Sequence, residues 1–224
     1  TGLQGNIAIP RQSGAATAYW VAEGGAPTES QQAIQQVSMI PRTCGAFTDI
    51  SRKLLIQSSI DVETMVRNDI AKVIALEIDR VALYGTGAAN EPLGLHNTAG
   101  IGSEAITANN PTFAQVVNME SDVASANALM GNLAYITGAT IRGAMKVRTK
   151  DSGSGQFLWG GDNTVNGYPA YMSNQVEAGD IWFGNWSELI LGYWSGLDLQ
   201  VDPYTGGASG NVRVRVLQDV DVAV

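Results

Sequence analysis

The longest regular pattern of apolar and polar positions covers residues 58–94 and predicts one long helix. Apolar residues recur at helical spacing, and polar residues fall on the opposite side. Ser59 or Asp61 can cap the first turn, and Gly85 can end the helix because glycine adopts the left-handed conformation without a Cβ penalty. The predicted helix has about six turns, twice the usual length. Its apolar positions are Val62, Val66, Ile70, Val73, Ile74 and Val81.

Two charged residues, Glu77 and Arg80, interrupt the apolar side of this helix. Residues three positions apart are neighbours on a helix surface, so these two can pair with each other or with a partner chain. The sequence leaves both arrangements open.

The strictest alternation lies at the end of the sequence, in residues 212–224. Valines occupy even-numbered positions and charged residues occupy odd-numbered ones, which predicts a long strand with one buried and one charged face. This strand and the long helix are far apart in the sequence. If they pack together, the segment between them becomes an inserted domain. The charged positions are Arg213, Arg215, Asp219 and Asp221.

A long hairpin is predicted over residues 18–40. The incoming strand is predicted at Tyr19, Trp20 and Val21, and the returning strand at residues 34–40. The glycines at 24 and 25 predict the turn between them. The tip has few apolar residues, so it cannot bury itself on its own subunit, and an isolated two-stranded hairpin is marginal in water. We expect this arm to lie on a neighbouring subunit; a mobile arm is the alternative.

The other predicted elements are shorter. A strand or an extended arm is expected over residues 1–11, and a strand followed by a short helical turn over 47–56. A second helix opens at Pro111 or Thr112, and a third carries the one basic cluster, Arg142, Lys146, Arg148 and Lys150. By range, the predictions are a helix at 113–129, a strand at 134–137, a helix at 138–150, a loop at 151–161, and strands at 169–172, 181–183, 189–193 and 197–201.

Composition limits the functions that the chain can have. Only 15% of residues are charged, against about a quarter in a typical soluble domain. Either much of the surface faces protein, or it is rich in small polar residues, as the 26 glycines suggest. The net charge of -8 argues against direct binding of nucleic acid but suits an acidic wall around packed DNA. No apolar run approaches a membrane span. Because the sequence starts at Thr1 and stops within a strand pattern, we expect further chain at both ends.

Candidate chemistry is sparse. His96 is the single histidine and Cys44 the single cysteine, which nearly excludes a transition-metal site and any internal disulfide. Cys44 is expected to be a small buried group and His96 a surface or capping residue. We therefore predict no catalytic, cofactor or metal site. A hydrolase would need a pocket that gathers Asp162, Asp180 and His96.

Motifs spread over most of the chain are similar to those of one family. They are residues 20–25 with 29–30, residues 51–58, residues 70–94, residues 166–169 with Ser173, residues 183–186 and residues 202–204. Their order and spacing resemble the major capsid proteins of tailed bacteriophages, which share the Hong Kong phage fold with encapsulin nanocompartments. The resemblance implies an α+β fold with a peripheral domain of spine helix and long strands, an inserted axial α/β domain and an extended β-hairpin loop.

The resemblance also implies boundaries and a function. Residues 1–13 would be the end of an N-terminal arm or strand, and residues 14–38 would form the extended loop. Residues 39–103 and 205–224 would form the peripheral domain, and residues 104–204 the axial domain. The chain would be a structural subunit, not an enzyme, that assembles into pentamers and hexamers of an icosahedral head around double-stranded DNA. The alternative is an encapsulin shell around an enzyme cargo.

The implied partners are further copies of the chain, with a scaffolding segment, a maturation protease, portal and decoration proteins as additional ones. DNA would be enclosed without sequence-specific binding, no membrane would be involved, and assembly would take place in the host bacterial cytoplasm before residence in the virion. No cofactor is expected. The candidate subunit contacts are Trp20, Glu23, Glu29, Arg142, Arg148, Arg213, Arg215, Asp219 and Asp221.

Some family members crosslink a loop lysine to an asparagine of a neighbour with help from a glutamate. Asn211 matches that asparagine, but the first lysine here is Lys53, after the loop, and Gln218 stands where the glutamate would be. Glutamine cannot act as a base, so we predict no autocatalytic crosslinks.

Overall fold

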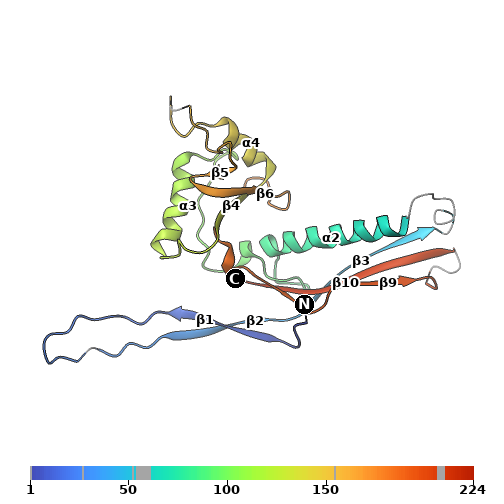
Figure 1. Cartoon of the computed structure of the whole chain (residues 1–224), viewed down its shortest axis with the longest axis horizontal. Coiled ribbons are helices and arrows are strands. Elements are labelled where there is room, and N and C mark those ends of the chain that lie inside the picture. The colour runs from blue at the N-terminus through green and yellow to red at the C-terminus, as the bar shows by residue number, and fades with distance from the viewer. Residues whose placement is uncertain (1, 27, 52, 54–61, 154, 206–209) are drawn as a thin grey trace.

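The computed structural model of the chain describes residues 2–26, 28–51, 53, 62–153, 155–205 and 210–224. A long helix lies along a sheet, a second lobe of helices and short strands stands over one end of that helix, and a two-stranded hairpin projects from the base of the sheet (Figure 1). We call these parts the sheet lobe, the α/β lobe and the hairpin. The mixed arrangement confirms the predicted α+β class.

The predicted long helix is present as α2 (Val62–Tyr84). Its predicted caps at positions 59 and 61 lie outside the described residues. The prediction that Val73 packs inward is wrong, because Val73 lies one position beside the buried stripe and is 50% exposed. Ile70, Ile74 and Ile78 follow i, i+4 spacing, so this part of α2 contacts the sheet along a narrow line. The last turn of α2 is buried on all sides, and Leu83 and Tyr84 pack with Val176 of the α/β lobe. The buried residues described in α2 are Ile70, Ile74, Ile78, Val81, Ala82, Leu83 and Tyr84.

The sheet under α2 is built on β10 (Asn211–Ala223), which pairs antiparallel with β3 (Arg42–Ser51). Val214 and Val216 are fully buried against Ile70 and Ile74 of the helix. The predicted packing of the alternating strand on the long helix is therefore confirmed. The part of the predicted turn at 51–56 that follows β3 lies almost wholly outside the described residues.

Two strands join this sheet from a segment that the sequence assigns to the axial domain. β8 (Ile190–Tyr193) and β9 (Asp198–Asp202) both pair antiparallel with β10. This placement corrects the predicted axial range 104–204, since its last strands belong to the sheet lobe. The physical reason is the length of β10: its 13 residues leave an edge opposite β3 that would otherwise stay unpaired.

The hairpin consists of β1 (Ile7–Gly14) and β2 (Ala33–Met39). The prediction of a strand at Tyr19–Val21 is therefore wrong, and the outgoing strand is β1, in the segment for which a strand or an extended arm is expected. Cross-strand pairs explain the register, because Ile7 lies opposite Met39 and Ile9 opposite Val37. Residues 19–21 lie beyond the paired register, which ends at Gly14 opposite Ala33.

The α/β lobe contains a four-stranded sheet in the order β5-β6-β4-β7. The central pair β4–β6 is parallel, and the two outer pairs are antiparallel. Two helices, α3 (Phe113–Ser125) and α4 (Ala139–Val147), complete the lobe. The prediction that Pro111 or Thr112 opens α3 is confirmed with Thr112 as the N-cap, which forms a capping box with Gln115. The strands are β4 (Leu133–Thr137), β5 (Thr164–Val165), β6 (Tyr168–Met172) and β7 (Ile181–Asn185), and the short 3-10 helices are η1 (Leu95–Asn97) and η2 (Trp186–Glu188).

Tyr84, the last residue of α2, joins the two lobes. Its hydroxyl donates to Asp180 Oδ2 at 2.8 Å and accepts bonds from Glu177 N and Trp182 Nε1, both at 3.1 Å. Burial, more than any of these bonds, raises the pKa of Tyr84 to about 12. The hydroxyl therefore stays a donor at neutral pH and keeps the helix end fixed to the α/β lobe.

Candidate assembly surfaces

The loop between β1 and β2, residues 15–32, carries the most exposed aromatic residue of the described chain. Trp20 has a relative exposure of 104%, so its side chain has no burial on its own subunit. Tyr19 and Val21 beside it are about half exposed, at 48% and 49%. The hairpin extends away from both lobes (Figure 1). Contiguous exposed apolar groups of this kind are typical of a protein-binding surface.

The two acidic candidates of this loop are also exposed. Glu23 is in the turn region, and Glu29 accepts a bond from the Gln31 amide at 3.3 Å. Ser30 ties the two arms together, because its hydroxyl accepts from Thr17 N at 2.9 Å and donates to Thr17 O at 3.1 Å. The loop is thus shaped by a few local bonds, while its apolar and charged side chains stay available.

On the charged face of β10, the arginines have partners within the chain. Arg213 donates two bonds to Asp49 at 2.7 and 2.9 Å and lies over the ring of Phe47 at 4.6 Å. The bonds from Arg213 lower the pKa of the Asp49 carboxyl. Arg215 donates to Gln200. A contact with a neighbour at this face would compete with these bonds or extend them.

The acidic end of the same face differs from the prediction at one position. Asp219 remains partly exposed and accepts a bond from the Thr43 hydroxyl at 2.6 Å. Asp221, a predicted subunit contact, is instead buried at 4% exposure. Its carboxylate accepts a bond from Ile40 N at 2.8 Å and lies 3.9 Å from Arg42 Nε. Asp221 therefore joins the base of the hairpin to β10, because this end of β10 is covered on both faces.

The basic cluster of the α/β lobe is partly directed inward. Arg142 stacks over Trp159 at 5.2 Å, and Arg148 donates to Asn110 O at 2.7 Å. Val147 lies between the basic residues with 79% of its surface exposed. The sequence predicted the charges but missed this apolar residue. The sequence analysis did not predict exposure of four other large apolar residues, Ile34, Phe47, Phe157 and Tyr204. Only Phe47 could have been recognised, because it is an apolar residue on the polar side of a strand.

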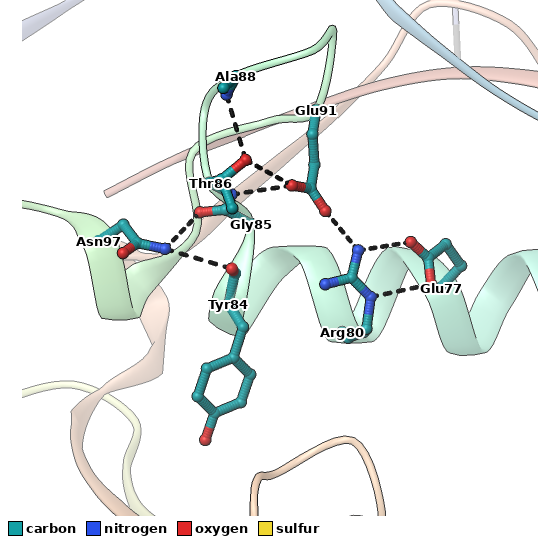
Figure 2. A network of polar contacts seen from close by, with 8 residues as sticks. All are labelled: Glu77, Arg80, Tyr84, Gly85, Thr86, Ala88, Glu91 and Asn97. Atoms are coloured by element: carbon teal, nitrogen blue, oxygen red, sulfur yellow. Dashed lines mark hydrogen bonds and ion pairs between the residues drawn. The ribbon is translucent and has the colours of Figure 1, made fainter.

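A polar network closes the exit of α2 (Figure 2). Arg80 donates to Glu77 from Nε at 3.0 Å and from Nη2 at 2.6 Å, so the two predicted neighbours pair with each other. Arg80 also donates to Glu91, which accepts further bonds from Thr86 N at 3.0 Å and Thr86 Oγ1 at 2.7 Å. The bonds from Thr86, with that from Arg80, lower the pKa of Glu91 to about 2. Sequence spacing offered no signal for Glu91, 11 residues after Arg80.

The loop that carries Glu91 returns tightly to the helix end. Gly94 N donates to Gly85 O at 2.8 Å, and a Cβ added to Gly94 would lie 2.4 Å from Gly85 N. Asn97 Nδ2 donates to the last carbonyls of α2, Tyr84 O at 3.2 Å and Gly85 O at 2.9 Å (Figure 2). These contacts hold the loop of residues 85–97 against the end of α2.

Of the candidate chemical residues, His96 and Asp180 line one cleft, but Asp162 does not, so the three are not gathered in one pocket. His96 is exposed in η1, and Cys44 lies against the core of the sheet lobe, where burial raises the pKa of its thiol. Asp180 is bonded to Tyr84, and Asp162 accepts a bond from Thr164 in a separate turn at 2.7 Å. In the described part of the chain, no group of three or more His, Cys, Asp or Glu side chains could hold a metal. No helix described here has the length and apolar character to cross a membrane.

The chain combines a long helix on a sheet, an inserted lobe and a projecting hairpin, and known proteins share this arrangement. The model of the phage capsid family matches residues 1–224, which is the whole chain. The chain belongs to the phage capsid family. The major capsid protein of Halomonas phage phiHAP-1 is 38% identical over 223 residues, covering 99% of this chain and 36% of that protein. The major capsid protein of Klebsiella oxytoca phage phiKO2 is 22% identical, covering 84% of this chain and 47% of that protein.

The chain therefore spans about a third to a half of the length of these relatives. Solved structures show the same fold. The capsid of a native GTA particle matches with a TM-score of 0.79 at 18% sequence identity. The match covers 100% of this chain and 83% of the capsid chain. The structure from Microbacterium phage Oxtober96 has a TM-score of 0.73 at 13% identity, covering 99% of this chain and 81% of its own.

Proposed function

We propose that this chain is the shell-forming part of a phage major capsid protein and that it self-assembles into pentamers and hexamers of an icosahedral head. Membership of the phage capsid family supports the structural role. The observation that carries self-assembly is Trp20, which is fully exposed on a hairpin that contacts neither lobe beyond its base. Such a surface finds burial on another copy of the chain.

In this proposal the sheet lobe is the peripheral domain and the α/β lobe is the axial domain, with the boundary moved to leave β8 and β9 in the former. The hairpin, residues 7–39, is the extended loop. Trp20, Glu23 and Glu29 contact a neighbour directly, whereas Arg213, Arg215 and Asp219 present a charged face to it. Arg142 and Arg148 lie beside Val147 at the axial contact.

Assembly of this kind depends on many contacts of moderate strength. A specific interface of standard size buries about 1,600 Å² in total. Each subunit of a shell makes several such contacts at once, so the assembled shell is stable while any single contact can still open during correction. The bonds of the Tyr84 hydroxyl to Asp180, Glu177 and Trp182 would hold the axial domain in the same orientation to the spine helix in every copy.

The enclosed cargo in this proposal is double-stranded DNA, held without sequence recognition. The net charge of -8 keeps the wall from binding DNA tightly, because like charges repel. Scaffolding, protease, portal and decoration proteins are the further partners, the virion is the final location, and the host cytoplasm is the place of assembly. No catalytic role is assigned. An encapsulin shell has no observation in its favour, since both capsid relatives described above come from phages.

Electron microscopy of the purified protein tests this function. Closed shells of uniform size, with double-stranded DNA in those from infected cells, are the expected result. A monomer that persists at every concentration contradicts the proposal. Shells that contain an enzyme instead of DNA would favour the encapsulin alternative.

A further inference from the structure

β7 leaves one of its edges open. It is the last strand in the order β5-β6-β4-β7 and pairs only with β4 in the described part of the chain. Trp186 N donates to Asn132 O at 2.9 Å, which identifies these two as a hydrogen-bonded pair of the ladder. Hydrogen-bonded pairs alternate along antiparallel strands. The backbone groups of Ile181, Phe183 and Asn185 therefore point away from β4, toward the open edge.

This edge lines a cleft with a volume of about 800 Å³. The cleft lies between β7, the second half of α3 and the segment 100–104. Met119 and Val123 of α3 and Ile101 of the segment line its walls with apolar groups. The volume falls in the range of about 300–1,000 Å³ that is usual for binding clefts. An extended segment laid along β7 would therefore have both backbone partners and apolar walls.

The charge of the cleft is of one sign. Its lining includes Glu104, Asp122, Asp180 and Glu188 but no lysine or arginine. Glu104 accepts a bond from the Asn118 amide at 3.3 Å, and Asp180 accepts one from the Tyr84 hydroxyl, so neither is neutralised by a cation. Asp122 faces the opposite wall, because a Cβ added to Gly102 would lie 3.9 Å from Asp122 Oδ2. A segment with positive charge complements this lining.

We propose that the open edge of β7 is a strand-addition site for an extended peptide segment of a partner polypeptide that carries lysine or arginine beside aliphatic residues. The segment's main chain bonds to Ile181, Phe183 and Asn185, as in β-augmentation. Its aliphatic side chains pack on Met119 and Val123, and its cation lies toward the carboxylates. Covering this edge also protects the subunit from unspecific strand pairing. The site is independent of the hairpin and of shell formation.

The test uses the full 224-residue protein and a blocked nine-residue probe, acetyl-Lys-Val-Thr-Val-Lys-Val-Thr-Val-Lys-amide. Amide hydrogen exchange is followed residue by residue by NMR. Saturation with the probe slows exchange at Ile181, Phe183 and Asn185 by about tenfold or more, since these amides gain acceptors. Exchange at Trp182 and Gly184 changes little, because their amides already face β4. A probe with glutamate in place of lysine, and one N-methylated at alternate amides, are expected not to bind.

A charge variant gives an independent readout. Asp122→Asn, at an exposed position of α3, is expected to weaken binding of the probe about twofold to fivefold, as for other exposed charge contacts. Asp198→Asn on β9 removes an equal charge outside the cleft and leaves binding unchanged. If both variants bind the probe more weakly to the same extent, the effect comes from the net charge of the protein. That result would overturn the placement of the probe's cation beside the carboxylates of the cleft.

Three results overturn the proposal as a whole. One is unchanged exchange at the three amides with the probe at millimolar concentration. Another is equal binding of the glutamate probe. The third is protection that rises with protein concentration in the absence of probe, which would assign the edge to a second copy of the chain. Shell formation is measured separately. If the peptide site fails its test, the proposed capsid function still stands, and if shells do not form, the peptide site can still be confirmed.

Discussion

Replacing Trp20 by alanine should separate the stability of the subunit from its ability to assemble. Trp20 is exposed by 104%, so its removal takes no burial from the folded chain. The free energy of unfolding of Trp20→Ala should therefore stay within about 0.5 kcal/mol of the original, as for most surface substitutions. Assembly, in contrast, loses one of its anchors.

The size of that loss follows from the side chain. Complete burial of a tryptophan covers about 150–250 Å², and at about 25 cal/mol/Å² this gives about 4–6 kcal/mol of gross stabilisation for each contact. Alanine substitution at interface hot spots removes about 2–4 kcal/mol, since part of the gross value is offset by ordering of the loop. Because about 1.4 kcal/mol corresponds to a tenfold change in affinity, the protein concentration at which assembly begins should rise at least tenfold.

Urea unfolding measures the first quantity, and light scattering against protein concentration measures the second. Trp159→Ala is the matched control, because Trp159 is 4% exposed in the core of the α/β lobe. It should lower the free energy of unfolding by about 3–5 kcal/mol. If Trp20→Ala destabilises the subunit by more than about 1 kcal/mol and leaves the onset of assembly unchanged, the reasoning about the hairpin is refuted.

Three further predictions concern the polar network at the exit of α2, the buried carboxylate of Asp221 and covalent chemistry. Glu91→Gln should lower the free energy of unfolding by about 1.5–3 kcal/mol at neutral pH, because it removes charge-assisted bonds. The pKa of Glu91 is lowered to about 2, so the stability that its carboxylate contributes is present above pH 4.5 and should disappear as the pH falls toward 2. Urea titrations at several pH values measure this, and a difference between the two proteins that does not change with pH would contradict it. Asp221→Ala should cost about 3 kcal/mol of unfolding free energy by leaving Arg42 without its buried partner, whereas an exposed contact residue would lose less than 1 kcal/mol. Denaturing electrophoresis of assembled particles should show a single monomer band, because Gln218 cannot assist Asn211 as a base; a ladder of covalent oligomers would disprove this.

The two elements with strict periodicity could be predicted from the sequence. α2 and β10 each bury one face against the other, so the pattern of their side chains reports the contact directly. Val73 shows the limit of this reasoning. A helix that lies on a sheet along a narrow stripe exposes apolar residues that a wider contact would have covered, and the width of the contact is not encoded in the helix alone.

The hairpin was recognised, but its register was not. Tyr19, Trp20 and Val21 have the composition of a strand, yet pairing is decided by what lies opposite. Ile7 and Ile9 lie opposite the apolar residues Met39 and Val37 of β2, whereas residues 19–21 are outside the paired ladder. Strand-like composition at exposed positions can therefore reflect a surface that binds another molecule instead of a pairing within the chain.

The contacts missed in the sequence are those made across long separations. Asp221 bonds to Ile40, 181 residues away, and its alternating position alone predicted a solvent-facing charge. β8 and β9 were assigned to the wrong part of the fold for the same reason, since nothing local tells which edge a short strand will join. Exposed apolar residues such as Val147 gave no signal, because exposure depends on the packing of the whole lobe.

The central claim is that the hairpin finds its missing burial on another copy of the chain. A photoreactive benzoylphenylalanine at position 20, in an equal mixture of ¹⁴N-labelled and ¹⁵N-labelled protein assembled together, tests it most directly. Mass spectrometry of the crosslinked peptides should show pairs of mixed isotope content, since position 20 contacts a different copy. Crosslinks formed only within single chains, with no mixed pairs in assembled protein, would contradict the account.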